Sequence, residues 1–142
     1  MRAIFGCLVT AAFLTAACSE SAGPRDEFVW TMENVAGYYI ATTFTREEGG
    51  VTTDQISPGA SIEVLLVATG ITSGRLFVPG GGEDGSDFDA NLVGTWQLSR
   101  DSVTLSHDAD TFLRDMTLAV GDTHLTGVET FGGVTIRVVL AR

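Results

Sequence analysis

The 142-residue sequence contains no lysine, and its eight basic residues are all arginine. Arg2 precedes all 18 acidic residues, so the chain after Cys18 carries seven arginines and a formal charge of −11. A surface so negative repels nucleic-acid phosphates and lacks the basic stripe that counterion release requires. Nucleic acid is therefore excluded as a partner, as is attachment to an anionic membrane through charge alone.

Cysteine is also scarce. The two cysteines, Cys7 and Cys18, both lie in the first 18 residues, so the rest of the chain has no internal disulfide and no thiolate ligand for zinc. The one long uncharged apolar run, residues 3–17, is too short and too rich in small residues for a transmembrane helix. We expect neither a structural metal nor a cofactor.

Residues 1–18 have the features of an export signal. Arg2 provides a positive start, and residues 14–18 read Leu-Thr-Ala-Ala-Cys, which resembles the bacterial lipobox. The resemblance implies cleavage before Cys18 and lipidation of Cys18. The protein would then be exported and held on a membrane by its lipid, facing the periplasm or in the outer membrane. The alternative is ordinary cleavage at an A-x-A-like site, with Cys18 incidental.

The remaining chain predicts one small folded domain, because 44% of the residues are hydrophobic and only 18% are charged. Residues 19–34 are interpreted as a tether followed by an apolar segment that caps the domain. From residue 35 to residue 142, short β-rich runs alternate with Gly, Asp, Ser and Pro, which is typical of an all-β fold. The predicted strands are residues 37–45, 61–69, 74–78, 93–100, 102–107, 115–120, 124–130 and 134–141.

Eight strands with short links predict an antiparallel up-and-down barrel, with a β-sandwich as the alternative. The pair Gly132-Gly133 suits a tight hairpin turn, and the strand after it alternates Val138 and Leu140 inward against outward neighbours. The same alternation places Trp96 and Leu98 on one face, so we expect Trp96 to be buried.

Two segments carry a family resemblance. Residues 35–39 (Val-Ala-Gly-Tyr-Tyr) and 92–96 (Leu-Val-Gly-Thr-Trp) both show the apolar-x-Gly-x-aromatic start of a lipocalin strand. The chain from residue 35 onward is therefore similar to bacterial lipocalin-like lipoproteins, which are small β-barrels. It departs from true lipocalins in having Tyr39 at the first strand, the complete motif in mid-chain and a shorter domain. The resemblance implies a barrel and a ligand site within it.

The segment before residue 116 supplies candidate ligand-binding side chains. If Met116 faces inward, strand alternation turns Phe112 and Arg114 the same way. An inward Arg114 could hold a ligand carboxylate or phosphate with its planar fork. It could equally pair with a buried acid such as Glu129 or lie at the rim in water. The candidate ligand-binding set is Arg114, Phe112, Trp96 and Tyr39, although aromatic residues could simply fill so small a barrel.

Two further segments are weaker candidates for ion binding. In the acidic glycine-rich segment 80–91, Asp87, Asp89 and Asn91 have the spacing that opens a calcium loop, but the rest of that template is missing. We interpret the segment as a solvated loop. His107 stands beside acidic residues in segment 106–110, which we interpret as a surface turn rather than a metal site.

No residue pattern supports catalysis, so we expect a protein that is not an enzyme. The predicted function is a membrane-anchored cell-envelope lipoprotein that binds a small apolar or amphipathic ligand in or at the mouth of its barrel. The alternative is a structural lipoprotein with a filled core, which acts on another envelope protein. A ligand-sized cavity would favour the first, and a solid core the second.

Overall fold

The computed structural model describes residues 29–142, so Cys18, the predicted signal peptide and most of the predicted tether lie outside the described residues. Ten strands and two four-residue helices follow one another in this part of the chain. They are α1 (Met32–Val35), β1 (Gly37–Glu48), β2 (Val51–Asp54), β3 (Ser61–Leu66), β4 (Ile71–Val78), β5 (Phe88–Asn91), β6 (Gly94–Ser99), β7 (Ser102–His107), α2 (Phe112–Asp115), β8 (Thr117–Val120), β9 (His124–Phe131) and β10 (Val134–Ala141).

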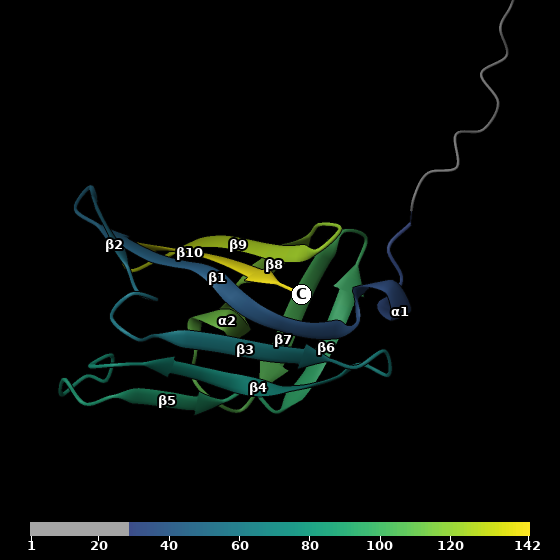
Figure 1. The fold of residues 1–142 in the computed structure, drawn as a ribbon, viewed down its shortest axis with the longest axis horizontal. Coiled ribbons are helices and arrows are strands. Elements are labelled where there is room, and N and C mark those ends of the chain that lie inside the picture. Colours follow the sequence, from purple (N-terminus) through teal and green to yellow (C-terminus); the bar gives the residue numbers. More distant parts are fainter. Residues whose placement is uncertain (1–28) are drawn as a thin grey trace, which may run out of the picture.

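Eight of the strands form a closed antiparallel barrel (Figure 1). Neighbours in the sheet follow chain order through β1, β3, β4, β6, β7, β8, β9 and β10, and β10 pairs back onto β1. Strand β2 forms a hairpin with β1, and β5 pairs with β4. Because the sheet closes on itself, the predicted eight-stranded up-and-down barrel is confirmed and the sandwich alternative is wrong.

Strands β5 and β6 together act as one bent strand along β4. The register of the β4 pairing is unchanged from β5 into β6, and the Leu92 N–H between them donates to the Gly74 carbonyl at 3.0 Å. At the bend the neighbouring backbones approach closely, since a Cβ on Gly94 would lie 2.0 Å from the Ser106 carbonyl oxygen. Only glycine fits at position 94, where the bent strand pairs with both β4 and β7.

Helix α1 covers one end of the barrel, which we call the closed end. A capping box between Thr31 and Asn34 starts the helix. The guanidinium of Arg142, at the end of the chain, donates to the carbonyls of Asn34 and Ala36 at 2.7 and 3.2 Å and to that of Asp122 at 3.0 Å. These contacts join the C-terminus to α1 and to the β8–β9 turn.

Large side chains fill the barrel above this end. Trp96 is 2% exposed, as predicted, and its indole N–H donates to the Val67 carbonyl at 2.7 Å. Tyr39 is equally buried, and its hydroxyl donates to the Val35 carbonyl at 2.6 Å. The inward side chains of β10 are part of the same core, as predicted from their alternation. This half of the barrel therefore has a solid interior.

Several predicted boundaries need correction. Strand β1 runs on to Glu48, because its polar end pairs with both β2 and β10. The predicted strand 61–69 ends at Leu66, and the next begins at Ile71 rather than residue 74. Strand β8 begins at Thr117, since Asp115 still belongs to helix α2 and Met116 caps that helix. Strands β2 and β5 were not predicted.

Candidate functional site

The barrel is hollow at the end away from α1, which we call the mouth. A cavity of about 360 Å³ opens there, within the size range of small-molecule sites. Its wall is mostly apolar and comes from β1, β4, β5, β10, α2 and the turns between them. The lining residues are Phe44, Arg46, Gln55, Val78, Pro79, Gly80, Gly81, Phe88, Asp110, Thr111, Phe112, Val134 and Ile136.

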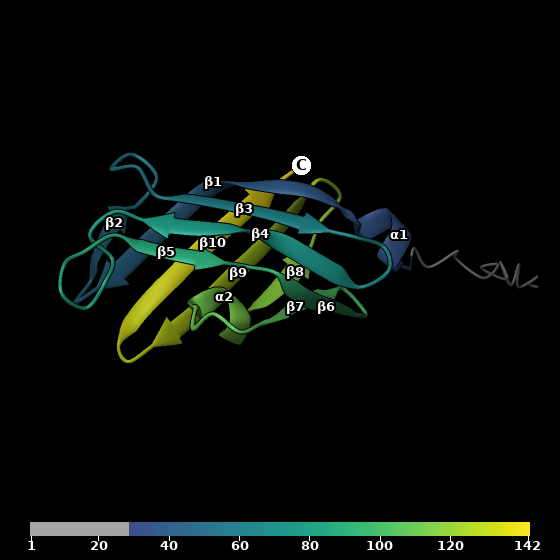
Figure 2. The ribbon, with the colours of Figure 1, turned by 90° about the horizontal axis from the view of Figure 1, so that it is seen from below.

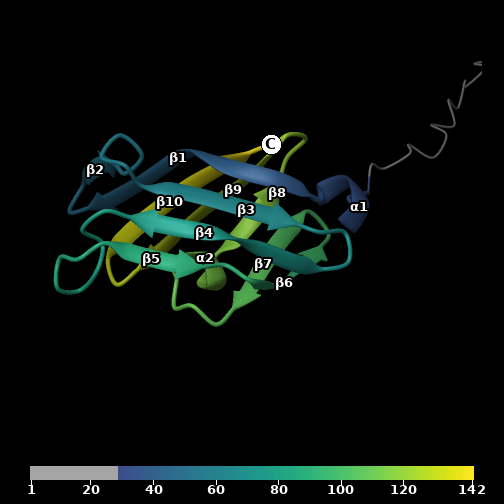
Figure 3. The ribbon, with the colours of Figure 1, turned by 60° about the horizontal axis from the view of Figure 1, so that its bottom comes forward.

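Helix α2 forms one side of the mouth. Figures 2 and 3 both show it beside the end of β5, away from α1. Thr111 caps it, with its hydroxyl accepting from the Arg114 N–H at 3.3 Å. Leu113 is fully buried in the core, while Phe112 turns to the cavity and packs on Phe44 with ring centroids 5.3 Å apart. The helix thus fixes an aromatic wall of the cavity.

The prediction that Arg114 faces inward with Phe112 is wrong. These residues lie in a helix, where two positions differ by about 200° rather than repeating as in a strand. The Arg114 guanidinium instead binds the carboxylates of Asp110 at 2.6 Å and Asp115 at 3.0 Å. Arg114 therefore does not line the cavity, although it holds Asp110, which does.

Tyr39 and Trp96 lie in the closed half and do not line the mouth cavity. Of the candidate ligand-binding set, only Phe112 does. Two aromatic residues that were not in this set, Phe44 and Phe88, line the cavity together with Phe112. Tyr39 and Trp96 fill the barrel, which is the second interpretation that the sequence left open.

Arg46 is the basic residue of the cavity wall, and the sequence analysis missed it. The pairing register of β1 shifts between Ala41 and Thr43, which changes the residues that face inward from odd-numbered to even-numbered positions. Phe44 is therefore buried, and Arg46, two positions further on, also faces the inside of the barrel. The Arg46 guanidinium contacts Glu48 at 2.7 Å, but both side chains are more than half exposed. Such a pair is worth little and leaves Arg46 able to bind an anion.

Below α2, His107 is buried and contacts the helix cap. Its Nε2 lies 2.8 Å from the Thr111 hydroxyl, and its Nδ1 has no hydrogen-bond partner among the described residues. The pKa of His107 is lowered from its ordinary 6.5, first because burial penalises the charged ring and then because Arg114 repels it, against smaller opposing effects of Asp115 and Asp108. This buried position corrects our prediction of a surface turn for His107.

The lowered pKa of His107 predicts a pH-dependent stability. The unfolded chain binds a proton near pH 6.5 while the folded protein does not, so the free energy of unfolding should fall as the pH drops below about 6.5. Urea unfolding from about pH 8 to about pH 5 measures this slope. His107→Gln should flatten it, whereas the same change at exposed His124 should leave it intact. Equal slopes for wild type and His107→Gln would contradict the assignment.

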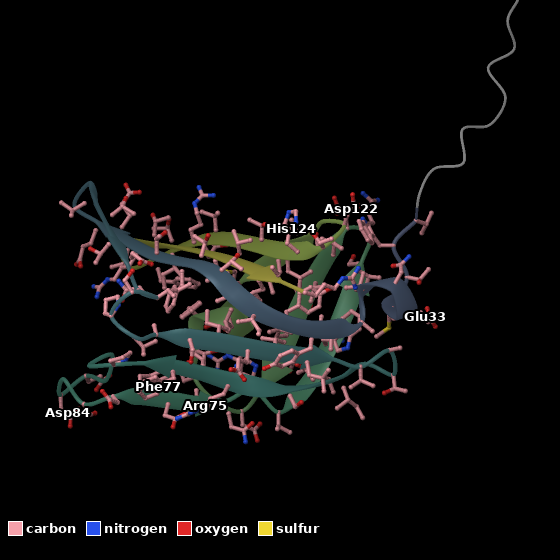
Figure 4. All side chains as sticks on the ribbon, in the orientation of Figure 1. Glu33, Arg75, Phe77, Asp84, Asp122 and His124 are labelled. Atoms are coloured by element: carbon pink, nitrogen blue, oxygen red, sulfur yellow. The ribbon has the colours of Figure 1, made fainter. Side chains whose placement is uncertain are left out.

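The glycine-rich segment 80–91 ends in a strand rather than remaining a loop throughout. Asp89, in β5, forms two bonds of 2.7 Å with the Arg75 guanidinium, which lowers the pKa of that carboxyl. Figure 4 shows Arg75 near Phe77, and the guanidinium carbon lies 5.1 Å from the centre of that ring. Asp87 accepts from the Gly80 N–H, and Asn91 from the Val93 N–H. These oxygens each bind a neighbour and do not converge.

A second hollow of about 480 Å³ lies outside the barrel wall, between β5 and the segment before α2. Three carboxylates border it, those of Asp89, Asp108 and Asp110. Two of them are already paired, with Arg75 and Arg114. The mouth cavity, with its apolar wall and inward cation, is the stronger candidate site.

No family model, curated protein or solved structure matches this chain. The lipocalin-like resemblance of the two Gly-x-aromatic segments therefore stays a prediction, while the barrel itself is seen directly. Between residues 29 and 142, neither helix is long and apolar enough to cross a membrane.

Proposed function

We propose that this protein is an exported, membrane-anchored lipoprotein that binds a small amphipathic ligand at the mouth of its barrel, without catalysing a reaction. The observation that carries the proposal is the cavity of about 360 Å³, an open apolar hollow above an otherwise filled core. A domain that acted only as a filled scaffold would have no reason to keep so large an apolar hollow open to solvent.

The residues that line the cavity indicate the chemical class of the ligand. Phe44, Phe112 and Ile136 contribute apolar surface to the cavity wall. Arg46 adds one cation, and the acid that shares the cavity, Asp110, binds Arg114 at 2.6 Å. An apolar body with one anionic group fits this arrangement, because the guanidinium fork binds a carboxylate or sulfonate with two parallel hydrogen bonds.

A fluorescent amphipathic anion tests this assignment. Anilinonaphthalene sulfonate should bind the purified protein at one site, and Arg46→Gln should weaken that binding by about tenfold or more, since a charge-assisted hydrogen bond contributes roughly 1.5 to 3 kcal/mol. Arg137→Gln is the matched control, because Arg137 pairs with Thr45 in the next strand and is exposed on the outer face. Equal weakening by both variants would show nonspecific attraction and contradict the site.

The anchor is proposed from the lipobox at Cys18, which lies outside the described residues. We expect Cys18→Ser to abolish incorporation of labelled fatty acid and to shift the protein from the membrane fraction to the soluble exported fraction. Cys7→Ser serves as the control and should leave labelling unchanged, because Cys7 lies within the segment that is cleaved off. Continued labelling of Cys18→Ser would rule out this anchor.

A further inference from the structure

The outer wall of the barrel carries an apolar patch that the mouth cavity does not explain. Six exposed side chains form it: Tyr38, Ile40, Leu65, Val67, Ile71 and Val93. They come from β1, β3, β4 and the links next to these strands. We call this group the wall patch.

Strand register makes the wall patch continuous. Tyr38 lies directly opposite Leu65, and Leu65 opposite Ser73. Val93, at the bend between β5 and β6, falls beside Ser73 because the register with β4 is unchanged there. One row toward the closed end, the Val67 N–H donates to the Ile71 carbonyl. Side chains of directly opposite residues are within contact distance, so the exposed apolar groups form one surface that Ser73 interrupts between Leu65 and Val93.

The wall patch lies next to the place where the chain enters the barrel. A methyl group on Gly70, in the turn between Val67 and Ile71, would lie 3.5 Å from the Met32 methyl of α1. The chain reaches α1 through Val29, itself an exposed apolar residue. Cys18 precedes Val29 by 11 residues, and a fully extended chain spans at most about 3.6 Å per residue. An acylated Cys18 would thus keep Val29, which leads into α1 beside the wall patch, within roughly 40 Å of the bilayer.

The chemistry of the wall patch suits a lipid surface. Tyr38 combines an exposed apolar ring with a hydroxyl that donates to Glu63 at 2.7 Å, an amphipathic side chain of the kind that settles at membrane interfaces. The border is acidic, because Glu63 lies on it and Asp89 and Asp108 line the hollow next to Val93, against one base, Arg75. The rest of the domain is acidic, which favours a zwitterionic over an anionic surface.

We propose that the wall patch rests on the zwitterionic surface of the bilayer that holds the Cys18 lipid, so that the barrel lies on its side with the mouth open to water. The inference depends on the proposed anchor, and it adds an orientation that the anchor alone does not set. It also accounts for the apolar side chains that gather on this wall beside α1, which Figure 1 shows at one end of the barrel.

Site-specific labelling of the full-length acylated protein tests the orientation. Val93→Cys and, as control, Val128→Cys each receive a fluorophore, which is practicable because the mature chain has no thiol other than the acylated Cys18. Val128 is similarly exposed but lies on β9, across the barrel from β4. In phosphatidylcholine vesicles that contain brominated lipid, the label at residue 93 should lose most of its fluorescence and the label at residue 128 should lose little. Equal quenching at both positions would overturn the proposal.

A second variant separates the inference from the anchor on which it rests. Leu65→Asp with Ile71→Asp should abolish the quenching at residue 93 while leaving the acyl mass and vesicle attachment unchanged. Absence of the acyl mass in the parent protein would refute the anchor. An acylated, attached protein whose residue 93 stays unquenched and instead cross-links to residue 93 of a second copy would refute the orientation alone, and would assign the wall patch to self-association.

Discussion

Gly94→Ala should destabilise the protein by about 2 to 4 kcal/mol. The added Cβ would lie 2.0 Å from the Ser106 carbonyl oxygen and 3.0 Å from the Cα of His107. Both atoms belong to the backbone of β7, which cannot move aside without breaking its pairing with β6. We expect a large drop in the urea midpoint with little change in the m-value, measured by circular dichroism.

Gly121→Ala provides the matched control. The three atoms nearest to a Cβ there all belong to the ring of His124, which is an exposed side chain that can rotate away. We expect a loss of no more than about 1 kcal/mol. If Gly94→Ala lowered the free energy of unfolding no more than Gly121→Ala, β6 and β7 would not approach each other closely at the bend in solution. The described geometry of the barrel wall would then be wrong.

Trp96→Ala should cost about 3 to 5 kcal/mol, because the largest side chain of the closed half would leave a cavity that its neighbours cannot fill. Trp96→Phe should cost less. It keeps an aromatic ring and loses the bond to the Val67 carbonyl, which still accepts from the Gly70 N–H at 2.9 Å. The difference between the two variants, measured by urea unfolding, separates packing from hydrogen bonding.

The neighbouring Gln97→Ala is the control for position, since Gln97 is on the same strand and faces the solvent. Its effect should stay within about 0.5 kcal/mol. Similar losses for Trp96→Ala and Gln97→Ala would mean that the closed half of the barrel is loosely packed. In that case the contrast between a solid closed half and a hollow mouth would be lost.

The barrel could be predicted because its strongest signals are local. The residues of the Gly132-Gly133 turn adopt φ values of 55° and 88°, as a tight hairpin between antiparallel strands requires. In β10, Val138 and Leu140 are fully buried and face the core as their alternation indicates. Trp96 is buried for the same reason. Turn chemistry and period-two patterning were enough to predict the strand neighbours from β6 to β10, but they left a sandwich open as the alternative to a closed barrel.

The residues that line the mouth could not be predicted, because their positions depend on strand pairing and on a short helix that have no clear sequence signal. Arg46 lies past the predicted end of its strand, in a polar stretch that becomes strand by pairing with β2 and β10. The four-residue helix that turns Phe112 inward and Arg114 outward is too short to show a helical period. The one sequence signal for this helix was Thr111, a residue type that often caps a helix N-terminus, three positions before Arg114.

Native mass spectrometry of the full-length acylated protein, released gently from detergent, tests the central claim most directly. The account predicts a bound small molecule with an acidic group in the wild type and its loss in Ile136→Trp, whose larger side chain would occupy the mouth cavity that Ile136 lines. Circular dichroism should show that this variant remains folded. A bound molecule retained in Ile136→Trp, or a wild type that stays ligand-free and does not bind anilinonaphthalene sulfonate, would contradict a ligand site at the mouth of the barrel.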